Sequence, residues 1–481
     1  MRPGLRAQHS QARQGQNRHV EFIRFWRHKR QPGISGAGLK ADALITREIP
    51  TNVNLRELQF SDPDRYPFLL QSTASDSSLG RYDILLAFPG KSLAAGMAGD
   101  PGGFLESLDA WWQDERIGSS NSDLPFLGGW FVYLGYELAA EIEPKLSLPP
   151  DPVLPRAFAV RCPAALIRDH MESKTFIVCE GSATDCIDIM QEDTRRIAVD
   201  TPGNVSGPVL IRAVGEEDPG RFTEAVDRAK QYIAAGDVFQ ANLSRGWSFE
   251  VGMSAADIYS RLAGSNPAPF AGCARWADRW IISSSPERLL SIRDGIASTR
   301  PIAGTRPRSA ETSRDHSLSA ELIANPKERA EHVMLIDLER NDLGRICVPG
   351  SIEVDEMMVI ESYAHVHHIV SNVRGRLRAG ITPGMAIRAV FPGGTITGCP
   401  KVRCMEIIAE LEASPRGAYT GSFGYLNRDG SMDLNILIRT MVLHGSDLRL
   451  RAGAGIVADS EPQAELDETR AKARGLLEAL T

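Results

Sequence analysis

The stretch FPGGTITGCPKVRCM, residues 391–405, sets a glycine turn and two threonine hydroxyls directly before a basic segment that starts at a proline. Glycines allow backbone amides to approach a ligand, and Pro400 suits the first turn of a helix. The unpaired amides and the dipole at such a helix start favour a bound carboxylate or phosphate. Taken alone, the stretch predicts an anion-binding helix start, and a capped surface helix fits the same residues.

Three further blocks lie in the same half of the chain: PIAGTRPR at 301–308, AEHVMLIDLERNDLGR at 330–345 and AGAGIVADSEPQAELDETRAKA at 452–473. In their order and spacing, the four blocks resemble the family of chorismate-utilising enzymes across residues 218–481. Four blocks in register are far more specific than one glycine motif. The resemblance implies an antiparallel two-sheet β-sandwich of two lobes, with helices outside and the active site between the lobes.

The bulk composition limits the classes of function. The chain has 481 residues, is 42% hydrophobic and carries a formal net charge of −7, so it can bury a large core. This weak negative charge gives no reason to expect nucleic-acid binding, and no apolar run approaches the ~18 residues of a membrane span. The seven cysteines are scattered without a C-x-x-C pair, which indicates neither a zinc site nor disulfides. We therefore expect a soluble protein of a reducing cytoplasm.

The chain divides into three segments. Residues 1–45 form a basic tail that we expect to be disordered, because residues 1–30 carry eight Arg or Lys against one acid and lack the apolar region of a secretory signal. A mis-assigned start and an organelle transit peptide are the alternatives. Residues 46–204 alternate short apolar runs, such as YDILLAF at 82–88 and TFIVCEG at 175–181, with turn-forming residues, as in a lobe of strands with a few helices. Residues 218–481 mix predicted strands such as RWIISSSP and LNILIRTMVL with long helices, of which the first is expected after residue 220. They form the predicted chorismate-binding region, so the fold class is α+β or α/β.

Two glutamates on separate predicted helices, Glu331 and Glu468, each have another acid close by in the sequence. Separated carboxylates suit Mg²⁺, which keeps several waters and takes one or two protein carboxylates together with the substrate. An acid on an amphipathic helix more commonly lies on a solvated face. The family resemblance implies that these two glutamates hold the Mg²⁺ to which the ring carboxylate of chorismate binds.

The resemblance also assigns groups to the carboxylates of the substrate. Lys472 follows Glu468 by one helical turn, so the two side chains share a face and would, as a bare pair, form a surface salt bridge. The resemblance implies instead that Lys472 contacts a substrate carboxylate. It also implies that Arg439, at the end of the strand LNILIRT, clamps the enolpyruvyl carboxylate as a bidentate donor. Gly453 and Gly455 would let backbone amides reach the same group.

The predicted reaction needs a proton donor for the leaving hydroxyl of chorismate, and a nucleophile. Glu287 in SSSPERLL matches the general acid of the family, a role that requires burial or neighbouring charge to raise its pKa; an ion pair with Arg288 is the alternative. Gln240 in GDVFQANLSR stands where isochorismate and salicylate synthases carry a lysine that activates water. Because a glutamine takes no proton at neutral pH, Gln240 favours ammonia as the nucleophile.

We expect the ammonia to come from another chain. A glutaminase uses a nucleophilic cysteine at a sharp elbow with a histidine partner, and this sequence has no G-x-C-x-G-x-Q segment. Cys399 precedes a proline within the predicted substrate loop. The expected partners are therefore chorismate, ammonia and a separate glutaminase subunit.

Two branches of the family aminate chorismate, and they differ in product. The FPGGTITGCPKVRCM block, NPAPF at 266–270 and DLNILIRT at 433–440 are similar to the branch that forms 4-amino-4-deoxychorismate. The anthranilate-forming branch more commonly shows FPAGT-x-SGAPK and NPSPY. We therefore expect 4-amino-4-deoxychorismate, with anthranilate as the alternative product. A third alternative is a non-catalytic partner of a glutaminase, which the presence of Glu287, Glu331 and Glu468 disfavours.

Other positions agree with the anthranilate branch or leave the choice open. Ala303 stands in PIAGT where many enzymes of the other branch carry a lysine that attacks the ring, and alanine closes that route. His368 and Thr395 match a pair associated with loss of pyruvate, although a histidine in HVHH also suits packing. Thr305, in the same block as Ala303, is assigned to the substrate. Gln71 replaces the acid of an LLES motif in the tryptophan pocket of anthranilate synthases, so we expect no tryptophan feedback, while a structural tryptophan pocket stays open.

Overall fold

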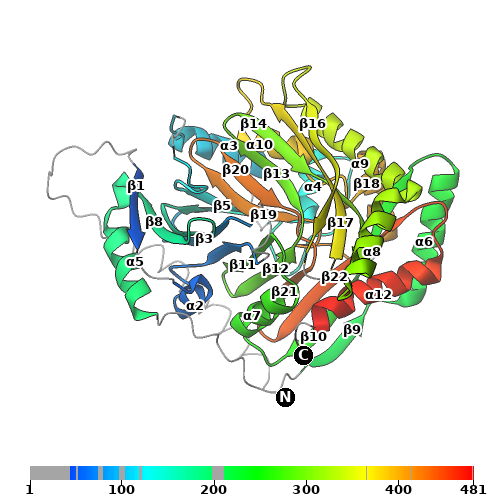
Figure 1. The fold of residues 1–481 in the computed structure, drawn as a ribbon, viewed down its shortest axis with the longest axis horizontal. Helices are drawn as coiled ribbons and strands as arrows, with labels where there is room; N and C mark the ends of the chain where they lie inside the picture. The colour runs from blue at the N-terminus through cyan, green and yellow to red at the C-terminus, as the bar shows by residue number, and fades with distance from the viewer. Residues whose placement is uncertain are drawn as a thin grey trace, which may run out of the picture. The chain divides into compact units, whose positions relative to one another are not determined.

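Two antiparallel sheets form the body of the described chain between Leu44 and Thr481 (Figure 1). The computed structural model describes residues 44–49, 53–73, 80–96, 103–118, 122–197, 211–363, 366–412, 414–478 and 480. The tail predicted over residues 1–45 lies outside these ranges up to residue 43, so its disorder stays a prediction. Leu44 and Ile45 do not belong to a tail, because they begin the first strand.

The first sheet has 12 strands within the described ranges. In spatial order they are β1 (Leu44–Ile49), β8 (Lys174–Glu180), β7 (Ala164–Asp169), β3 (Tyr82–Ala87), β2 (Phe68–Gln71), β11 (Phe270–Trp276), β12 (Arg279–Ser285), β21 (Thr440–His444), β22 (Asp447–Ile456), β10 (Gln240–Val251) and β18 (Gly398–Cys399), with β9 (Ile211–Glu216) also paired to β10. Each pair of neighbouring strands is antiparallel, for example β10 with β22.

The second sheet has 10 strands in the described part of the chain. In order they are β15 (Ile302–Pro307), β17 (Val366–Arg376), β14 (Ile296–Arg300), β13 (Arg288–Arg293), β20 (Met432–Asn435), β19 (Ser422–Asn427), β5 (Gly129–Leu134), β6 (Ala157–Cys162) and β4 (Ser92–Ala95), with β16 (Glu353–Ser362) also paired to β17. Both sheets contain strands from residues 46–204 and from residues 218–481: β2 pairs with β11 in the first sheet and β5 with β19 in the second. The two segments are therefore interleaved in space, and their division stays a prediction about the sequence.

Aromatic side chains fill the space between the two sheets. Phe68 on β2 stacks on Phe131 of β5 with ring centroids 4.0 Å apart, and Phe158 on β6 stacks on Trp276 of β11 at 4.1 Å. Because successive side chains of a strand point to opposite faces, the same strands present a second apolar set to the outer helices. The expected antiparallel sandwich with helices outside is confirmed.

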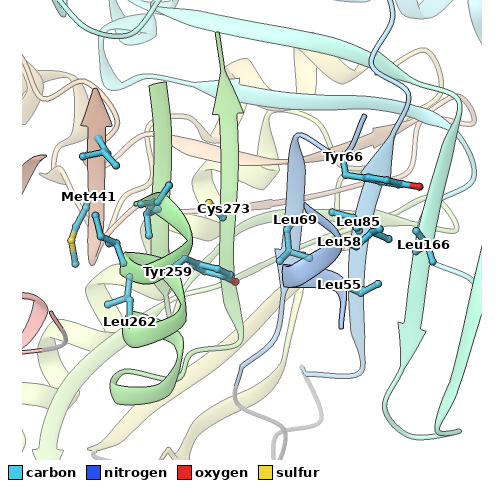
Figure 2. Close-up of a cluster of buried hydrophobic side chains, with 14 of the residues drawn as sticks. Leu55, Leu58, Tyr66, Leu69, Leu85, Leu166, Tyr259, Leu262, Cys273 and Met441 are labelled. Atoms are coloured by element: carbon cyan, nitrogen blue, oxygen red, sulfur yellow. The ribbon is translucent and has the colours of Figure 1, made fainter. Parts of the chain in front are cut away.

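Helices cover the outer faces of both sheets. Against the first sheet pack α2 (Leu55–Ser61), α5 (Asp185–Arg196), α6 (Pro219–Ala234), α7 (Ala255–Ser265), α11 (Lys401–Leu411) and α12 (Pro462–Glu478); against the second pack α3 (Phe104–Glu115), α8 (Thr312–Ala324), α9 (Pro326–Gly344) and α10 (Pro383–Val390). Short helical turns lie at η1 (Tyr136–Leu138), α4 (Ala139–Ile142) and η2 (Gly181–Ala183). Figure 2 shows Leu55 and Leu58 of α2, and Tyr259 and Leu262 of α7, packed against strands of the first sheet. No helix in the described ranges is both long and apolar enough to cross a membrane.

The start of α9 is encoded locally and orients several charged side chains. Asn325 caps the helix, because its side-chain oxygen accepts hydrogen bonds from the amides of Lys327 at 2.9 Å and Glu328 at 3.2 Å. Pro326 occupies the first helical position, where its missing N–H costs no hydrogen bond. With the start fixed, the helical period turns His332 into the interior and leaves Glu331 half-buried beside it.

Candidate active site

Glu287 and Arg439 lie where the chain crosses from one sheet to the other. Glu287 falls between β12 of the first sheet and β13 of the second, and Arg439 falls between β20 of the second sheet and β21 of the first. The two crossings are hydrogen-bonded: the Ile436 amide donates to the Glu287 carbonyl at 3.0 Å, and the Ser284 amide donates to the Arg439 carbonyl at 3.1 Å. The backbone thus places both side chains at the junction of the sheets.

The prediction of a single strand over LNILIRTMVL is wrong. β20 ends at Asn435 and β21 begins at Thr440, and the residues between them change sheets. Arg439 has a backbone φ of 51°, in the left-handed region that a side chain seldom adopts. The run is mostly apolar because most residues of both strands and of the crossing are buried, so its composition does not reveal the break.

Glu287 is buried, with only 4% of its surface exposed. Burial raises its pKa to about 8, the nearby Thr395 hydroxyl opposes that shift, and the negative charge of Glu339 adds to it. Its Oε1 has no hydrogen-bond partner in the described structure. Arg288, the alternative partner considered from the sequence, instead makes a bidentate pair with Asp433 at 2.9 Å. The Glu287 carboxyl is therefore protonated at neutral pH and able to donate.

Arg439 is a half-buried cation without a carboxylate partner among the described residues. Its Nη1 donates to the Asn266 side-chain oxygen at 3.2 Å, and no carboxylate of the described residues forms an ion pair with it. Burial lowers its pKa, with Tyr363 acting in the opposite direction. A buried guanidinium is costly unless it is paired, so this site suits the carboxylate of a ligand.

Gln240, the first residue of β10, connects this strand to α9 through a side-chain hydrogen bond. Its Nε2 donates to Oε1 of Glu331 at 3.1 Å, while its own Oε1 has no partner among the described residues. Gly455 on β22 makes room for this side chain, because a Cβ there would lie 2.4 Å from Gln240 Nε2. The structure therefore brings together Gln240, Glu331 and Gly455.

Glu331 and Glu468 lie close enough for their charges to interact. Burial raises the pKa of Glu331, the hydrogen bond from Gln240 lowers it, and the carboxylates of Glu328 and Glu468 raise it further. Within the described ranges, no cluster of three or more His, Cys, Asp or Glu side chains is arranged to hold a metal. The site therefore offers a pair of carboxylates on two helices rather than a closed cage.

Lys472 is engaged by the protein itself. Its Nζ lies 2.7 Å from Oε1 of Glu468 and donates to the Gly453 carbonyl oxygen at 2.9 Å. Gly453 is tightly enclosed, since a Cβ there would lie 2.7 Å from the Tyr419 hydroxyl and 2.8 Å from Oδ1 of Asn242. In this structure, Lys472 therefore helps to anchor α12 to β22, and its contact with a substrate carboxylate stays a prediction.

His368 faces β15 from the neighbouring strand β17. Its Nδ1 lies 3.0 Å from the Thr305 hydroxyl and 3.3 Å from the Gly304 carbonyl oxygen, while Nε2 has no partner in the described structure. Burial lowers its pKa to about 4, and the charge of Arg439 adds to this effect. His368 is therefore neutral at pH 7. Ala303 is buried two residues before Thr305 on the same strand, so the structure brings these three residues together.

The stretch at residues 391–405 forms a loop followed by a helix. The predicted helix is confirmed from Lys401 onward, and Pro400 precedes it as the cap rather than lying in its first turn. Lys401 pairs with Asp342 of α9 and donates to the Val390 carbonyl oxygen at 3.0 Å. The basic residue at the helix start thus binds an internal carboxylate, while Thr395 lies beside Glu287.

Sequence reasoning missed several polar groups that the fold brings to the site: Asn242, Asn266, Glu339, Asp342 and Tyr419. Asn242 could have been found, since it lies two residues after Gln240 and a strand presents such positions on one face. Its Oδ1 has no partner among the described residues. The others depend on contacts between distant segments. Glu339, for instance, has the spacing of an ordinary helical acid and only the folded chain shows its burial.

A cavity of about 590 Å³ is lined by Gln71 together with residues of both sheets. Gln71 is satisfied within the protein, because its Nε2 donates to Asp83 at 3.0 Å and its Oε1 accepts from the Tyr259 hydroxyl at 3.1 Å. Both statements about tryptophan made from the sequence therefore stay predictions: that it exerts no feedback control, and that a structural tryptophan pocket stays open.

Comparison with known proteins identifies the class. The family of chorismate binding enzymes matches residues 84–478. The chain is 42% identical over 412 residues to an anthranilate synthase component I-like protein of Synechocystis sp., covering 84% of this chain and 83% of that protein. It is 40% identical over 398 residues to aminodeoxychorismate synthase component 1 of Bacillus subtilis, covering 79% and 82%. The crystal structure of anthranilate synthase component I from Streptococcus pneumoniae superposes with a TM-score of 0.73 at 32% identity, covering 83% and 93%.

The chain therefore belongs to the chorismate binding enzymes, as its motifs indicated. Within that family it is an enzyme acting on chorismate, of the type that includes anthranilate synthase component I and aminodeoxychorismate synthase component 1.

Proposed function

We propose that the chain is component I of an aminodeoxychorismate synthase, which converts chorismate and ammonia to 4-amino-4-deoxychorismate. The supporting observation is that the three blocks typical of that branch pack as one unit. Asn435 of DLNILIRT donates to the carbonyl oxygen of Phe270 in NPAPF at 3.0 Å. Gly393 of the FPGGT block packs against the same segment, since a Cβ there would lie 2.9 Å from Ile436 Cδ1.

The residues of the site suit amination rather than hydration. Gln240 takes no proton at neutral pH and holds Glu331 through its amide, so it activates no water. Ammonia needs no such activation, because the free amine is already a nucleophile. Glu287 gives its proton to the departing ring hydroxyl, which leaves as water when the new C–N bond forms, and Arg439 holds a substrate carboxylate.

Mg²⁺ is proposed as the cofactor, held by Glu331 and Glu468. The pair fits this ion, since Mg²⁺ takes one or two carboxylates and the substrate, and a cation there would offset the burial and the neighbouring negative charges that raise the pKa of Glu331. When bound, the ion supplies positive charge for the ring carboxylate. Glu331→Gln and Glu468→Gln should each abolish chorismate consumption, and full turnover in EDTA would contradict the assignment.

The ammonia is proposed to come from a separate glutaminase subunit. The purified chain should be inactive with glutamine alone and active with an ammonium salt at alkaline pH, because it lacks the cysteine elbow of a glutaminase. Release of glutamate from glutamine by the purified chain would contradict this part of the proposal.

Anthranilate synthase component I is the second candidate. Ala303 lies buried on β15 where a lysine would be needed for a ring adduct, and the neutral His368 with its unpaired Nε2 is able to accept a proton. Both observations favour a site that continues to anthranilate with loss of pyruvate.

The deciding experiment incubates the chain with chorismate, Mg²⁺ and an ammonium salt, with and without a lyase that forms 4-aminobenzoate. Chromatographic appearance of 4-aminobenzoate only with the lyase supports the proposal. Fluorescent anthranilate as the main product without the lyase would assign the chain to the second candidate.

A further inference from the structure

Three buried carboxyl groups interact with one another, and one ammonium, that of Lys401, lies beside two of them, Glu339 and Asp342. Glu287 is 4%, Glu339 7% and Asp342 2% exposed, and among the described residues around them the ammonium is that of Lys401, which pairs with Asp342. Glu339 and Asp342 are three residues apart on α9 and share one face. Lys401 enters from the start of α11, and Glu287 from the crossing between the sheets.

One ammonium cannot balance three carboxylates in a low-dielectric interior. Lys401 is committed to Asp342, so ionisation of both remaining carboxyls would bury two uncompensated negative charges. Burial raises the pKa of Glu339 to about 7, Asp342 adds to the shift, and Lys401, the Thr299 hydroxyl and the Gly394 amide oppose it. The charged form of Glu339 therefore has three favourable neighbours, whereas Oε1 of Glu287 has no hydrogen-bond partner in the described structure, so Glu339 is the carboxyl that the surroundings favour as the charged one.

The glycine turn of the 391–405 stretch connects these carboxyls. The Gly394 backbone lies against Glu339: a Cβ on that glycine would be 3.3 Å from Glu339 Oε1 and 2.5 Å from Leu338 Cδ2. The next residue, Thr395, lies beside Glu287. A carboxylate at position 339 therefore holds the turn that carries Thr395, and its charge faces Glu287.

We propose that Glu339 is a positioning residue for proton donation, which anchors the turn at Gly394 and Thr395 and keeps the proton on Glu287. This inference rests on the proposed role of Glu287 as the proton donor. The groups that face Glu339 are Asp342 on its own helix, Lys401 on α11, Glu287 on the crossing, and the uncharged Thr299 and Gly394.

The test compares the full-length wild type with Glu339→Gln and Glu339→Ala in the ammonium-dependent reaction. The rate is measured against pH at constant free ammonia, since the ammonium equilibrium itself varies with pH. Without the charge at 339, the alkaline limb of kcat/KM should move to lower pH by about one unit. Glu339→Asp, which keeps the charge, should return the limb toward its wild-type position. Glu339→Ala is the second variant because it removes the charge without placing an amide group beside the Gly394 N–H.

Asp337→Asn is the matched control. Asp337 lies on the same helix, exposed and paired with Arg340 at 2.9 Å, so this variant removes one negative charge from α9 without touching the buried group. Its alkaline limb should match the wild type. An unmoved limb in folded Glu339→Gln and Glu339→Ala, or an equal shift in Asp337→Asn, would overturn the proposal.

A second measurement needs no turnover. Infrared difference spectra between each protein and its Glu287→Gln counterpart follow the carbonyl band of the protonated Glu287 carboxyl as pH rises. This band should disappear at lower pH in Glu339→Gln than in the wild type, and coincident titrations would refute the inference. If the wild type forms no aminated product, the proposed function fails, and the infrared titration still decides the coupling of the two carboxyls.

Discussion

Replacing Arg439 by methionine should make the protein more stable and a much poorer enzyme. Arg439 is half-buried, burial lowers the pKa of its guanidinium, its hydrogen bond goes to the uncharged Asn266, and no described carboxylate pairs with it. Methionine fills a similar volume without a charge, so the cost of burying an uncompensated cation disappears. The site holds a charge that the folded protein alone does not need.

Both magnitudes follow from this geometry. Two charge-assisted hydrogen bonds to a substrate carboxylate contribute about 1.5–3 kcal/mol each, so their loss should lower kcat/KM by a factor on the order of 10² to 10⁴. Removing the buried charge should raise the free energy of unfolding by about 1 kcal/mol. Arg439→Lys should be intermediate in activity, because it keeps the charge and loses the bidentate fork.

The assay pairs chorismate kinetics with thermal unfolding, and Arg161→Met serves as the control. Arg161 is another mostly buried arginine, but it pairs with Glu115 at 2.5 Å and with Glu180 at 2.6 Å. Its removal should destabilise the protein by about 3 kcal/mol and leave kcat/KM unchanged. A wild-type KM in Arg439→Met, or a loss of stability as large as that of Arg161→Met, would refute the reasoning.

Three further outcomes follow from the same site. Glu287→Gln should keep chorismate affinity by calorimetry and lose single-turnover rate by a factor on the order of 10² or more; a near-native rate would identify another acid. In the wild type, kcat/KM at constant free ammonia should fall as pH rises through about 8, the pKa of Glu287. Because that value lies above the ordinary 4.5, the stability associated with the protonated carboxyl is lost as pH rises from about 4.5 to about 8 and is level above that, which thermal unfolding against pH would show. Gly455→Ala should lower kcat/KM at least about tenfold, because the added carbon would lie 2.4 Å from Gln240 Nε2; Gly475→Ala, with open space around it, should not.

The local parts of the fold were predictable because their signals are local. YDILLAF, TFIVCEG and RWIISSSP are apolar runs bounded by turn residues, and each became a strand. The helix predicted after residue 220 begins at Pro219 with Asp218 as its cap. The prediction of one strand over LNILIRTMVL was wrong because burial on both sides, rather than alternation of apolar and polar residues, determines the composition of this run. A buried crossing between two sheets needs the same apolar residues as a strand, so only the pairing partners reveal the difference.

The site was predictable only where a single segment carries the pattern. Matching blocks pointed to Glu287, Arg439 and Gln240, and the fold leaves each of them with an unpaired polar atom or an uncompensated charge among the described residues. Glu339 carried no such signal, since an acid on a helix ordinarily faces solvent. Its environment arises from α11, β14 and the 391–405 loop, which no short window of sequence contains.

In the glycine-rich stretch, the donors that were expected to bind an external anion contact carboxyl groups of the protein itself. Backbone amides and basic groups near a helix start do attract anions, and the sequence therefore predicted an anion site. In the folded chain, the Gly394 amide and Lys401 instead meet Glu339 and Asp342, both of which belong to the protein. The Gly394 amide and Lys401 therefore order the carboxyls of Glu339 and Asp342, while Thr395 lies beside Glu287. A change in this loop is therefore expected to alter the pH dependence of the proton donor, and an effect on substrate affinity would have to arise through Thr395 or its neighbours.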